Sequence, residues 1–323
     1  MTANSTTPWP LQTAVLFLVF NRPDTTARVF EMIRKAKPPR LYVAADGPRA
    51  KRVGEAQKVR RVRTIATAVD WPCDLKTLFR AKNYGCKHAV SAGITWFFEH
   101  EERGIILEDD CLPHVDFFRF CDVLLEHYAC DKRVSVITGN NFQKGQQRGD
   151  GSYYLSKYNH CWGWASWRRA WNDYDGGLPF WTAWSKSEDW KKKNPDPVER
   201  RYWKKIFDRV RAGQIDSWAY PWTACVWRSG GLTVTPNVNL VSNIGFGPDA
   251  THTASANNSL AGIVTDALGE IRHPGVVEQD AVADRYVFDH TFGGRDSRFP
   301  RSLIHIPRRA VGFAYGKLKE IFI

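Results

Sequence analysis

Short apolar runs alternate with amphipathic stretches along the first part of the chain. Ala14–Phe20 and Leu41–Ala45 are continuous apolar runs, a pattern typical of parallel strands buried on both faces. The stretch between them has one apolar face and predicts a helix capped by Asp24 or Thr25. A strand, a helix and a second strand in this order predict a right-handed parallel βαβ unit.

The alternation continues to about residue 142. Residues 49–63 predict a basic helix whose charged side chains face solvent, and residues 86–100 predict a helix with one apolar face. Asp116 is expected to cap a further helix. Additional strands are expected at Leu75–Arg80, Ile105–Leu107 and Val134–Ile137.

The remainder of the chain lacks this regular alternation. Aromatic residues crowd together from Tyr153 to Trp190 without a clear order of strands and helices. The polar stretch Lys191–Pro197 predicts an exposed loop, and residues 199–212 predict an amphipathic helix. The apolar run that ends at Trp227 fits either a helix or a strand, and Leu232–Val241 is expected to be extended.

Composition narrows the class of protein. The 323 residues carry 46 Lys and Arg against 34 Asp and Glu, a formal net charge of +12 that attracts anions such as nucleotides, nucleic acid or acidic lipid headgroups. Seven cysteines without metal-type spacing indicate free thiols, so we expect a cytoplasmic protein. No apolar stretch is long enough to span a bilayer.

The most informative stretch is Ile105–Asp110, in which three apolar residues run into three consecutive carboxylates, Glu108, Asp109 and Asp110. Carboxylates that lie close together repel one another, and a divalent cation removes that repulsion. Oxygen ligands suit Mg²⁺ or Mn²⁺, either of which can bridge the phosphates of a nucleotide. The alternative is an exposed acidic turn that follows a strand.

The residues around this stretch resemble a known family. Glu108-Asp109-Asp110 is followed by Cys111-Leu112-Pro113 and then by Asp116-Phe117-Phe118. This order resembles the metal-binding segment of GT-A fold glycosyltransferases, in particular the N-acetylglucosaminyltransferase I family and bacterial family-2-like nucleotide-diphospho-sugar transferases. The resemblance implies a Rossmann-like α/β fold, with a mostly parallel central sheet flanked by helices.

The resemblance also implies roles for individual residues. Asp110 resembles the direct protein ligand of Mn²⁺, with Mg²⁺ as the alternative, and Asp216 resembles the catalytic base. His252 resembles a histidine in a loop that closes over the donor. The residues that resemble the donor and nucleotide site are Arg22, Asp46, His88, Glu108, Asp109, Trp162, Gly163 and Trp164.

These roles imply an inverting, metal-dependent transfer of a sugar from a UDP-sugar, such as UDP-GlcNAc or a related hexose donor, to a hydroxyl group. The acceptor would be a glycan, a lipid-linked glycan or a protein. Asp189 and Asp249 are alternative candidates for the base. In the family's W-D-D-W region, Ile215 replaces the first tryptophan, which leaves recognition of a donor N-acetyl group open.

The same reading divides one domain into two halves. Residues 11–142 would bind the nucleotide sugar, and residues 143–297 would form an aromatic-rich acceptor side. Residues 298–323 form a basic amphipathic tail that either lies on an anionic bilayer at the inner membrane face or packs back on the domain.

Two other functions compete with sugar transfer. A nucleotidyltransferase that makes sugar nucleotides would need a glycine-rich phosphate loop after the first strand, where this chain has Asn21-Arg22-Pro23-Asp24. A nucleic-acid binder would fit the positive charge, but the basic residues are dispersed and no aromatic RNA-binding motif is present. We therefore expect no nucleic-acid partner.

Overall fold

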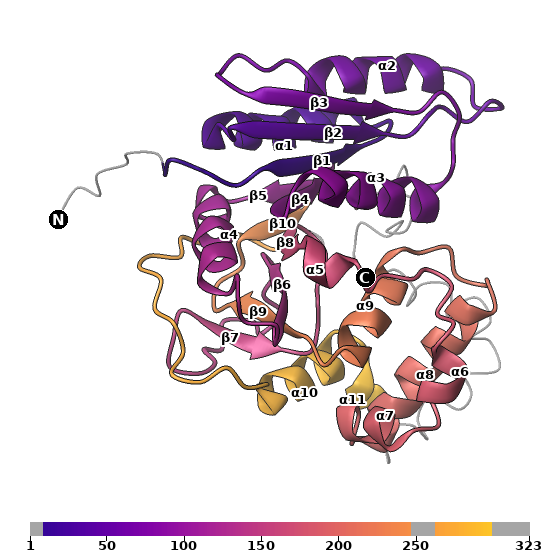
Figure 1. Cartoon of the computed structure of the whole chain (residues 1–323), viewed down its shortest axis with the longest axis vertical. Coiled ribbons are helices and arrows are strands. Elements are labelled where there is room, and N and C mark those ends of the chain that lie inside the picture. Colours follow the sequence, from indigo (N-terminus) through magenta and orange to yellow (C-terminus); the bar gives the residue numbers. More distant parts are fainter. Residues whose placement is uncertain (1–8, 247–261, 299–323) are drawn as a thin grey trace.

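A single twisted sheet of eight strands, in the order β3-β2-β1-β4-β8-β6-β9-β7, forms the centre of the molecule. The computed structural model describes residues 9–246 and 262–298 (Figure 1). Strands β8 and β7 run opposite to the others, so the sheet is mostly parallel. The predicted α/β class and the parallel β1–β2 unit are confirmed.

The strands fall into two groups along the chain. The first group comprises β1 (Val15–Val19), β2 (Arg40–Ala45), β3 (Asp74–Phe79), β4 (Arg103–Glu108) and β6 (Val134–Thr138). The second group comprises β7 (Tyr153–Ser156), β8 (Trp164–Trp167) and β9 (Leu232–Pro236). A separate two-stranded sheet pairs β5 (Cys111–Pro113) with β10 (Val241–Asn243).

Helices cover both faces of the sheet because its central strands are apolar on both sides. In β1, Phe17 and its alternate neighbours pack on α1 (Pro23–Ala36), α2 (Glu55–Ala66) and α4 (Val115–His127). Leu16 and Leu18 face the other way and pack with α3 (Cys86–His100). The basic helix predicted at 49–63 corresponds to α2, which begins later than predicted, at Glu55.

The second part of the chain adds a helical, aromatic-rich layer at the lower right of Figure 1. Its largest buried side chains are tryptophans, among them Trp181, Trp203 and Trp227. The helices are α5 (Arg168–Trp171), α6 (Trp181–Trp184), α7 (Glu188–Lys193), α8 (Pro197–Arg211), α9 (Ala219–Arg228), α10 (Ala281–His290) and α11 (Gly294–Ser297). The run that ends at Trp227 is thus a helix, and the predicted helix at 199–212 is confirmed as α8.

The structure corrects the predicted loop over Lys191–Pro197. The first part of this stretch is the end of α7, and Asn194 is buried and accepts a hydrogen bond from Lys157 Nζ at 3.1 Å. The prediction was wrong because Lys191 and Lys192 lie on the outer side of a short helix whose buried anchor is Trp190.

Two helix caps also differ from the prediction. Helix α1 begins at Pro23, so Asp24 lies in its first turn and Thr25 is not the cap. Proline is well suited to the first turn because it has no backbone N–H to leave unpaired. At α4 the imidazole of His114 accepts the N–H of Asp116, so His114 is the cap instead of Asp116.

The cysteines and the helix lengths can also be compared with the expectations from the sequence. The seven cysteines are free in the structure, as expected. None of the described helices is long and apolar enough to cross a membrane.

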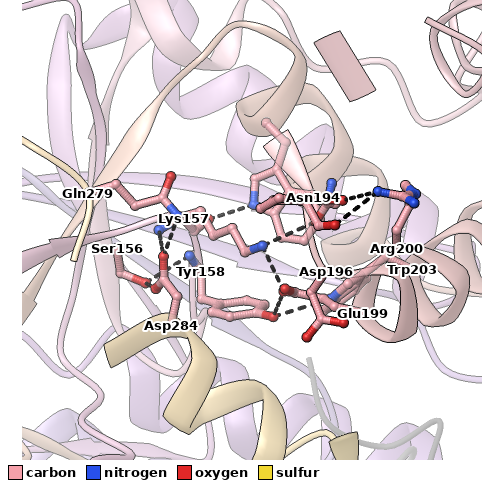
Figure 2. A network of polar contacts seen from close by, with 12 residues as sticks. Ser156, Lys157, Tyr158, Asn194, Asp196, Glu199, Arg200, Trp203, Gln279 and Asp284 are labelled. Carbon is pink, nitrogen blue, oxygen red and sulfur yellow. Dashed lines mark hydrogen bonds and ion pairs between the residues drawn. The ribbon is translucent and has the colours of Figure 1, made fainter. Parts of the chain in front are cut away.

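A buried ion pair ties the helical layer to the sheet (Figure 2). Lys157, which follows β7, places its ammonium 2.7 Å from the carboxylate of Glu199 in α8, and both side chains are almost fully buried. The Glu199 carboxylate also accepts the hydroxyl hydrogen of Tyr158. The residue before Lys157, Ser156, donates a hydrogen bond to Asp284 in α10, which also accepts one from Gln279.

We predict that Lys157→Met destabilises the fold, because it leaves the Glu199 carboxylate buried without its cation. The free energy of unfolding, measured by urea denaturation, should fall by about 3–5 kcal/mol. Lys191→Met breaks the exposed pair with Glu188 and should change it by less than about 1 kcal/mol. Equal losses in the two variants would contradict this account of the buried pair.

Candidate active site

The candidate site lies where the parallel strands β1, β2 and β4 end side by side. A cleft of about 250 Å³ opens there, between the sheet edge and the start of α3. Five side chains predicted from the sequence line this one cleft: Arg22, Asp46, Glu108, Asp109 and Asp216. The carboxyl edge of an open α/β sheet is the usual place for ligands, because the loops there can diverge around them.

Arg22 joins the end of β1 to the carboxylates that end β4. Its guanidinium lies 2.5 Å from Asp109 Oδ1 and 2.9 Å from Asp110 Oδ2. Asp109 also accepts the backbone N–H of Phe20 at 3.0 Å, so β1 fixes this carboxylate from two directions. Burial alone would lower the pKa of Arg22, but the charges of Asp109, Asp110 and Glu108 outweigh burial and raise it.

Two of the acids at the end of β4, Glu108 and Asp109, are crowded and shielded from water. Removal from water raises the pKa of Glu108 to about 8, and the charges of Asp110 and Asp109 add to the shift. Burial likewise raises the pKa of Asp109 to about 6, although the charge of Arg22 opposes it. One arginine is therefore too little positive charge for three neighbouring acids.

Asp46, at the end of β2, holds the turn that leads into α3. Its carboxylate accepts the backbone N–H groups of Gly47, Tyr84 and Gly85 and the side-chain amide of Asn83, at 2.9–3.1 Å. Gly85 has φ +80°, a left-handed conformation that favours glycine. Asp46 thus shapes the wall of the cleft as well as facing into it.

Asp216 comes from the second part of the chain, between α8 and α9. It is exposed, and its carboxylate lies next to Gly85 at the start of α3. The neighbouring Trp218 is buried and stacks on Trp164 with ring centroids 5.8 Å apart. The aromatic layer therefore anchors the segment that brings Asp216 to the cleft.

The Trp162-Gly163-Trp164 segment precedes and enters β8, beside β4. Gly163 has φ +72°, and a Cβ there would lie 2.7 Å from Val241. Trp164 is buried in the core, whereas Trp162 is only partly buried and packs edge-on against Phe246. Neither tryptophan lines the cleft, so in the described residues the segment supports the site from behind.

The loop after β10 approaches the site from the other side. A Cβ on Gly245 would lie 2.2 Å from Asp110 Oδ2 and 2.5 Å from Arg22 Nη1. Only a residue without a side chain allows the backbone to pass so close to this pair.

Two predicted residues lie elsewhere. His88 is exposed on α3 and lines a neighbouring groove with Tyr84, Trp96 and Tyr174 instead of the cleft. His252 lies outside the described residues, as does Asp249. Asp189, the other alternative base, is exposed on α7 and lines a different hollow beside Trp184.

The cleft also contains residues that the sequence analysis did not select: Arg49, Arg80, Asn83 and Cys86. Asn83 could have been found from the Asn-Tyr-Gly turn after β3, which marks a strand end at the ligand edge. Cys86 is not a reactive thiolate, because burial raises its pKa well above the usual value. Arg49 could not have been selected from the sequence, because it stands among several other basic residues and no motif distinguishes it.

The acids at the end of β4 offer oxygen ligands to a divalent cation. Among the described residues no group of three His, Cys, Asp or Glu side chains forms a complete metal site. Mg²⁺ and similar ions often use one or two carboxylates together with substrate phosphates and water. Asp110, whose side chain remains partly exposed beside two other acids, fits such a site.

Comparison with known proteins adds little to this geometry. No family model matches the sequence, and no curated protein matches it. Among solved structures, HddC from Yersinia pseudotuberculosis is similar over 50% of this chain and 80% of its own, with 10% identity and a TM-score of 0.31. A UDP-glucose pyrophosphorylase complexed with UDP-glucose covers 50% of this chain and 79% of its own, with 11% identity and a TM-score of 0.30. Similarities of this size do not assign a function.

We predict that Asp46→Ala loosens the turn at Asn83–Gly85, because the N–H groups of Tyr84 and Gly85 lose their acceptor. The free energy of unfolding should fall by on the order of 3 kcal/mol in urea denaturation. Asp150→Ala is the control, since Asp150 is exposed and makes no hydrogen bond through its side chain with the described residues. An Asp46→Ala protein as stable as this control would show that the carboxylate does not hold the turn.

Proposed function

We propose that this protein is an inverting, metal-dependent glycosyltransferase of the GT-A type. It transfers a sugar from a UDP-sugar to a hydroxyl group of a glycan or glycoconjugate. The observation that carries the proposal is the convergence of Arg22, Asp46, Glu108, Asp109 and Asp216 on one cleft at the carboxyl edge of the sheet. These residues come from both parts of the chain.

The nucleotide would bind at the end of the cleft that lies over β1 and β2. Asp46 lines this end of the cleft, and it would accept a uracil N–H by exchanging one of the hydrogen bonds that it takes from the Asn83–Gly85 turn. Arg80 and Arg49 line the same cleft, and Arg80 would add positive charge beside the phosphates, whereas the charge of Arg49 is offset by Glu55. Asp109, held by Arg22, would accept hydrogen bonds from ribose, and Glu108 from the donor sugar.

Asp110 would hold Mn²⁺ or Mg²⁺ together with the donor diphosphate. When bound, the ion supplies Lewis-acid stabilisation of the leaving diphosphate. Arg22 faces the same position and contributes a fixed positive charge. Because Arg22 is held by two carboxylates, its guanidinium is already oriented before substrate binds.

Asp216 would act as the general base. Its carboxylate accepts the proton of the acceptor hydroxyl while the hydroxyl oxygen attacks the anomeric carbon. The bond from that carbon to the diphosphate oxygen breaks on the opposite face, and the electron pair leaves with UDP. This single displacement inverts the anomeric configuration. The exposed position of Asp216 at the cleft is compatible with access by a large acceptor.

A sugar-nucleotide nucleotidyltransferase is the competing enzyme class, since it would also use acids at this sheet edge. The turn from β1 to α1 is short and has no glycine, which disfavours a phosphate-wrapping loop there. The two reactions give different products. Incubation with Mn²⁺ and a panel of UDP-sugars should release UDP, whereas UTP with a sugar 1-phosphate should release no pyrophosphate. Pyrophosphate release in the second reaction, without UDP release in the first, would replace the proposal by its competitor.

We predict that Asp216→Asn lowers turnover by about 10²–10⁴-fold, the usual contribution of a general base, and leaves UDP affinity in Mn²⁺ nearly unchanged. Turnover is measured as UDP release from the best donor of the panel. Asp189→Asn is the matched control, because this exposed acid lies outside the cleft, and its turnover should equal that of the wild type. Wild-type turnover in Asp216→Asn would remove Asp216 from the mechanism.

We also predict that Asp110→Asn weakens Mn²⁺-dependent UDP binding by at least about tenfold, since it removes the ligand charge that faces the metal. Calorimetric titration with UDP in Mn²⁺ measures the change. Asp24→Asn, at an exposed acid in the first turn of α1, is the control and should bind as the wild type does. Unchanged binding in Asp110→Asn would show that Asp110 does not hold the metal.

A further inference from the structure

The strongest unexplained feature of the surface is the basic face of α2 and of the turn before it. We define this basic face as Lys51, Arg52, Lys58, Arg60 and Arg61. All five side chains are exposed, and none forms an ion pair with another described residue. Helix α2 lies at the outer edge of the molecule, at the top of Figure 1, with Val59 and Val62 turned inward.

Several exposed cations on other helices have an acidic partner. Arg34 pairs with Asp70, Lys191 with Glu188, and Lys204 with Asp208. On α2 the only acid, Glu55, is already held by Arg49 and by the amide of Asn21. Its pKa is lowered to about 2, chiefly by hydrogen bonds from Arg49, so it stays charged and its charge is offset by Arg49.

The basic face therefore repels itself unless an external anion is present. Lys58 and Arg61 are three residues apart on one helix, a spacing at which like charges weaken a helix. They line, with Arg52, a groove of about 790 Å³ between the starts of α1 and α2. Neither helix start has a side-chain cap. Two acids, Asp24 and Glu55, also line the groove, and Glu55 is paired with Arg49.

An apolar residue stands at the tip of this surface. Val53 is fully exposed, directly after Arg52 in the turn that Gly54 ends. Cations around a projecting apolar side chain suit the interface of a bilayer, where headgroups meet acyl chains. No aromatic residue occurs between 48 and 64 to stack on bases, which disfavours a single-stranded nucleic acid.

We propose that the basic face docks the protein on a bilayer that contains anionic phospholipids. Clusters of four to eight Lys and Arg on a helix have the charge density that such surfaces attract. The groove shares Asn21, Arg22 and Arg49 with the candidate active-site cleft. A bilayer seated on α2 would therefore lie beside the opening of the cleft, within reach of a lipid-linked acceptor. The docking itself does not depend on the proposed sugar transfer.

Co-sedimentation with vesicles tests the proposal on the full chain. The wild type should bind phosphatidylcholine vesicles that contain about one third phosphatidylglycerol, and should not bind pure phosphatidylcholine. Binding should fall steeply between low and about 0.5 M salt, because salt screens exposed charges. Binding to both lipids alike, or to neither, would overturn the proposal.

Charge-removal variants locate the surface. Each cation removed should weaken binding about fivefold, so the Gln variant of all five residues should lose on the order of a thousandfold. The control replaces five other exposed lysines that form no ion pair with the described residues: Lys35, Lys132, Lys186, Lys192 and Lys205. It should lose far less, although it removes the same total charge.

Three outcomes would contradict the basic face as the docking surface. If its Gln variant binds vesicles as the wild type does, the membrane contact lies elsewhere in the chain. If the control loses as much, only net charge matters. If an oligonucleotide binds in a manner that depends on these five residues while vesicles do not bind, the partner is nucleic acid. Circular dichroism verifies that both variants are folded.

Discussion

The rest of the site depends on one electrostatic constraint, the contact of Arg22 with the carboxylates that end β4. Strands β1 and β4 are parallel neighbours, so their carboxyl ends bring Arg22 and Asp109 together at the sheet edge. Asp109 is buried and would be costly to keep charged without this cation. Arg22 nevertheless cannot balance Glu108, Asp109 and Asp110 together, and this excess of negative charge is what a divalent cation with a nucleotide diphosphate would complement.

The aromatic second half of the chain supports the site from behind the acids. Strand β8 inserts between β4 and β6, so the Trp162-Gly163-Trp164 segment lies directly behind the acids. Trp164 then stacks on Trp218, two residues after Asp216. Most tryptophans of this half are core residues. Their contribution to the site is to fix the position of a carboxylate that arrives from a distant part of the chain.

The first half of the fold agrees well with the prediction, because β1 and β2 are continuous apolar runs with clear turns after them. The amphipathic helix predicted at 86–100 also has the observed bounds of α3. In the second half no strand was predicted at β7 or β8, because aromatic residues occur in sheet and helix alike and periodicity carries no information there. The predicted loop over Lys191–Pro197 was wrong because the stretch includes the end of α7. In the site, the resemblance selected Arg22, Asp46, Glu108, Asp109 and Asp216, and the structure brings these five residues to one cleft. The multiple hydrogen bonds that Asp46 accepts, and the separation of His88 from the cleft, depend on how the Asn83–Gly85 turn is oriented, which no local pattern encodes.

The most direct test of the central claim is a calorimetric titration of the wild-type protein with UDP, carried out with Mn²⁺ and again with the metal chelated. The account predicts binding with Mn²⁺ and at least about tenfold weaker binding without it, because the diphosphate and Asp110 hold the ion together. GDP and CMP, titrated in the same way, should bind more weakly than UDP if Asp46 pairs with uracil. No binding of UDP in Mn²⁺, or binding that ignores the metal, would contradict the assignment of the acidic strand end as a metal–diphosphate site.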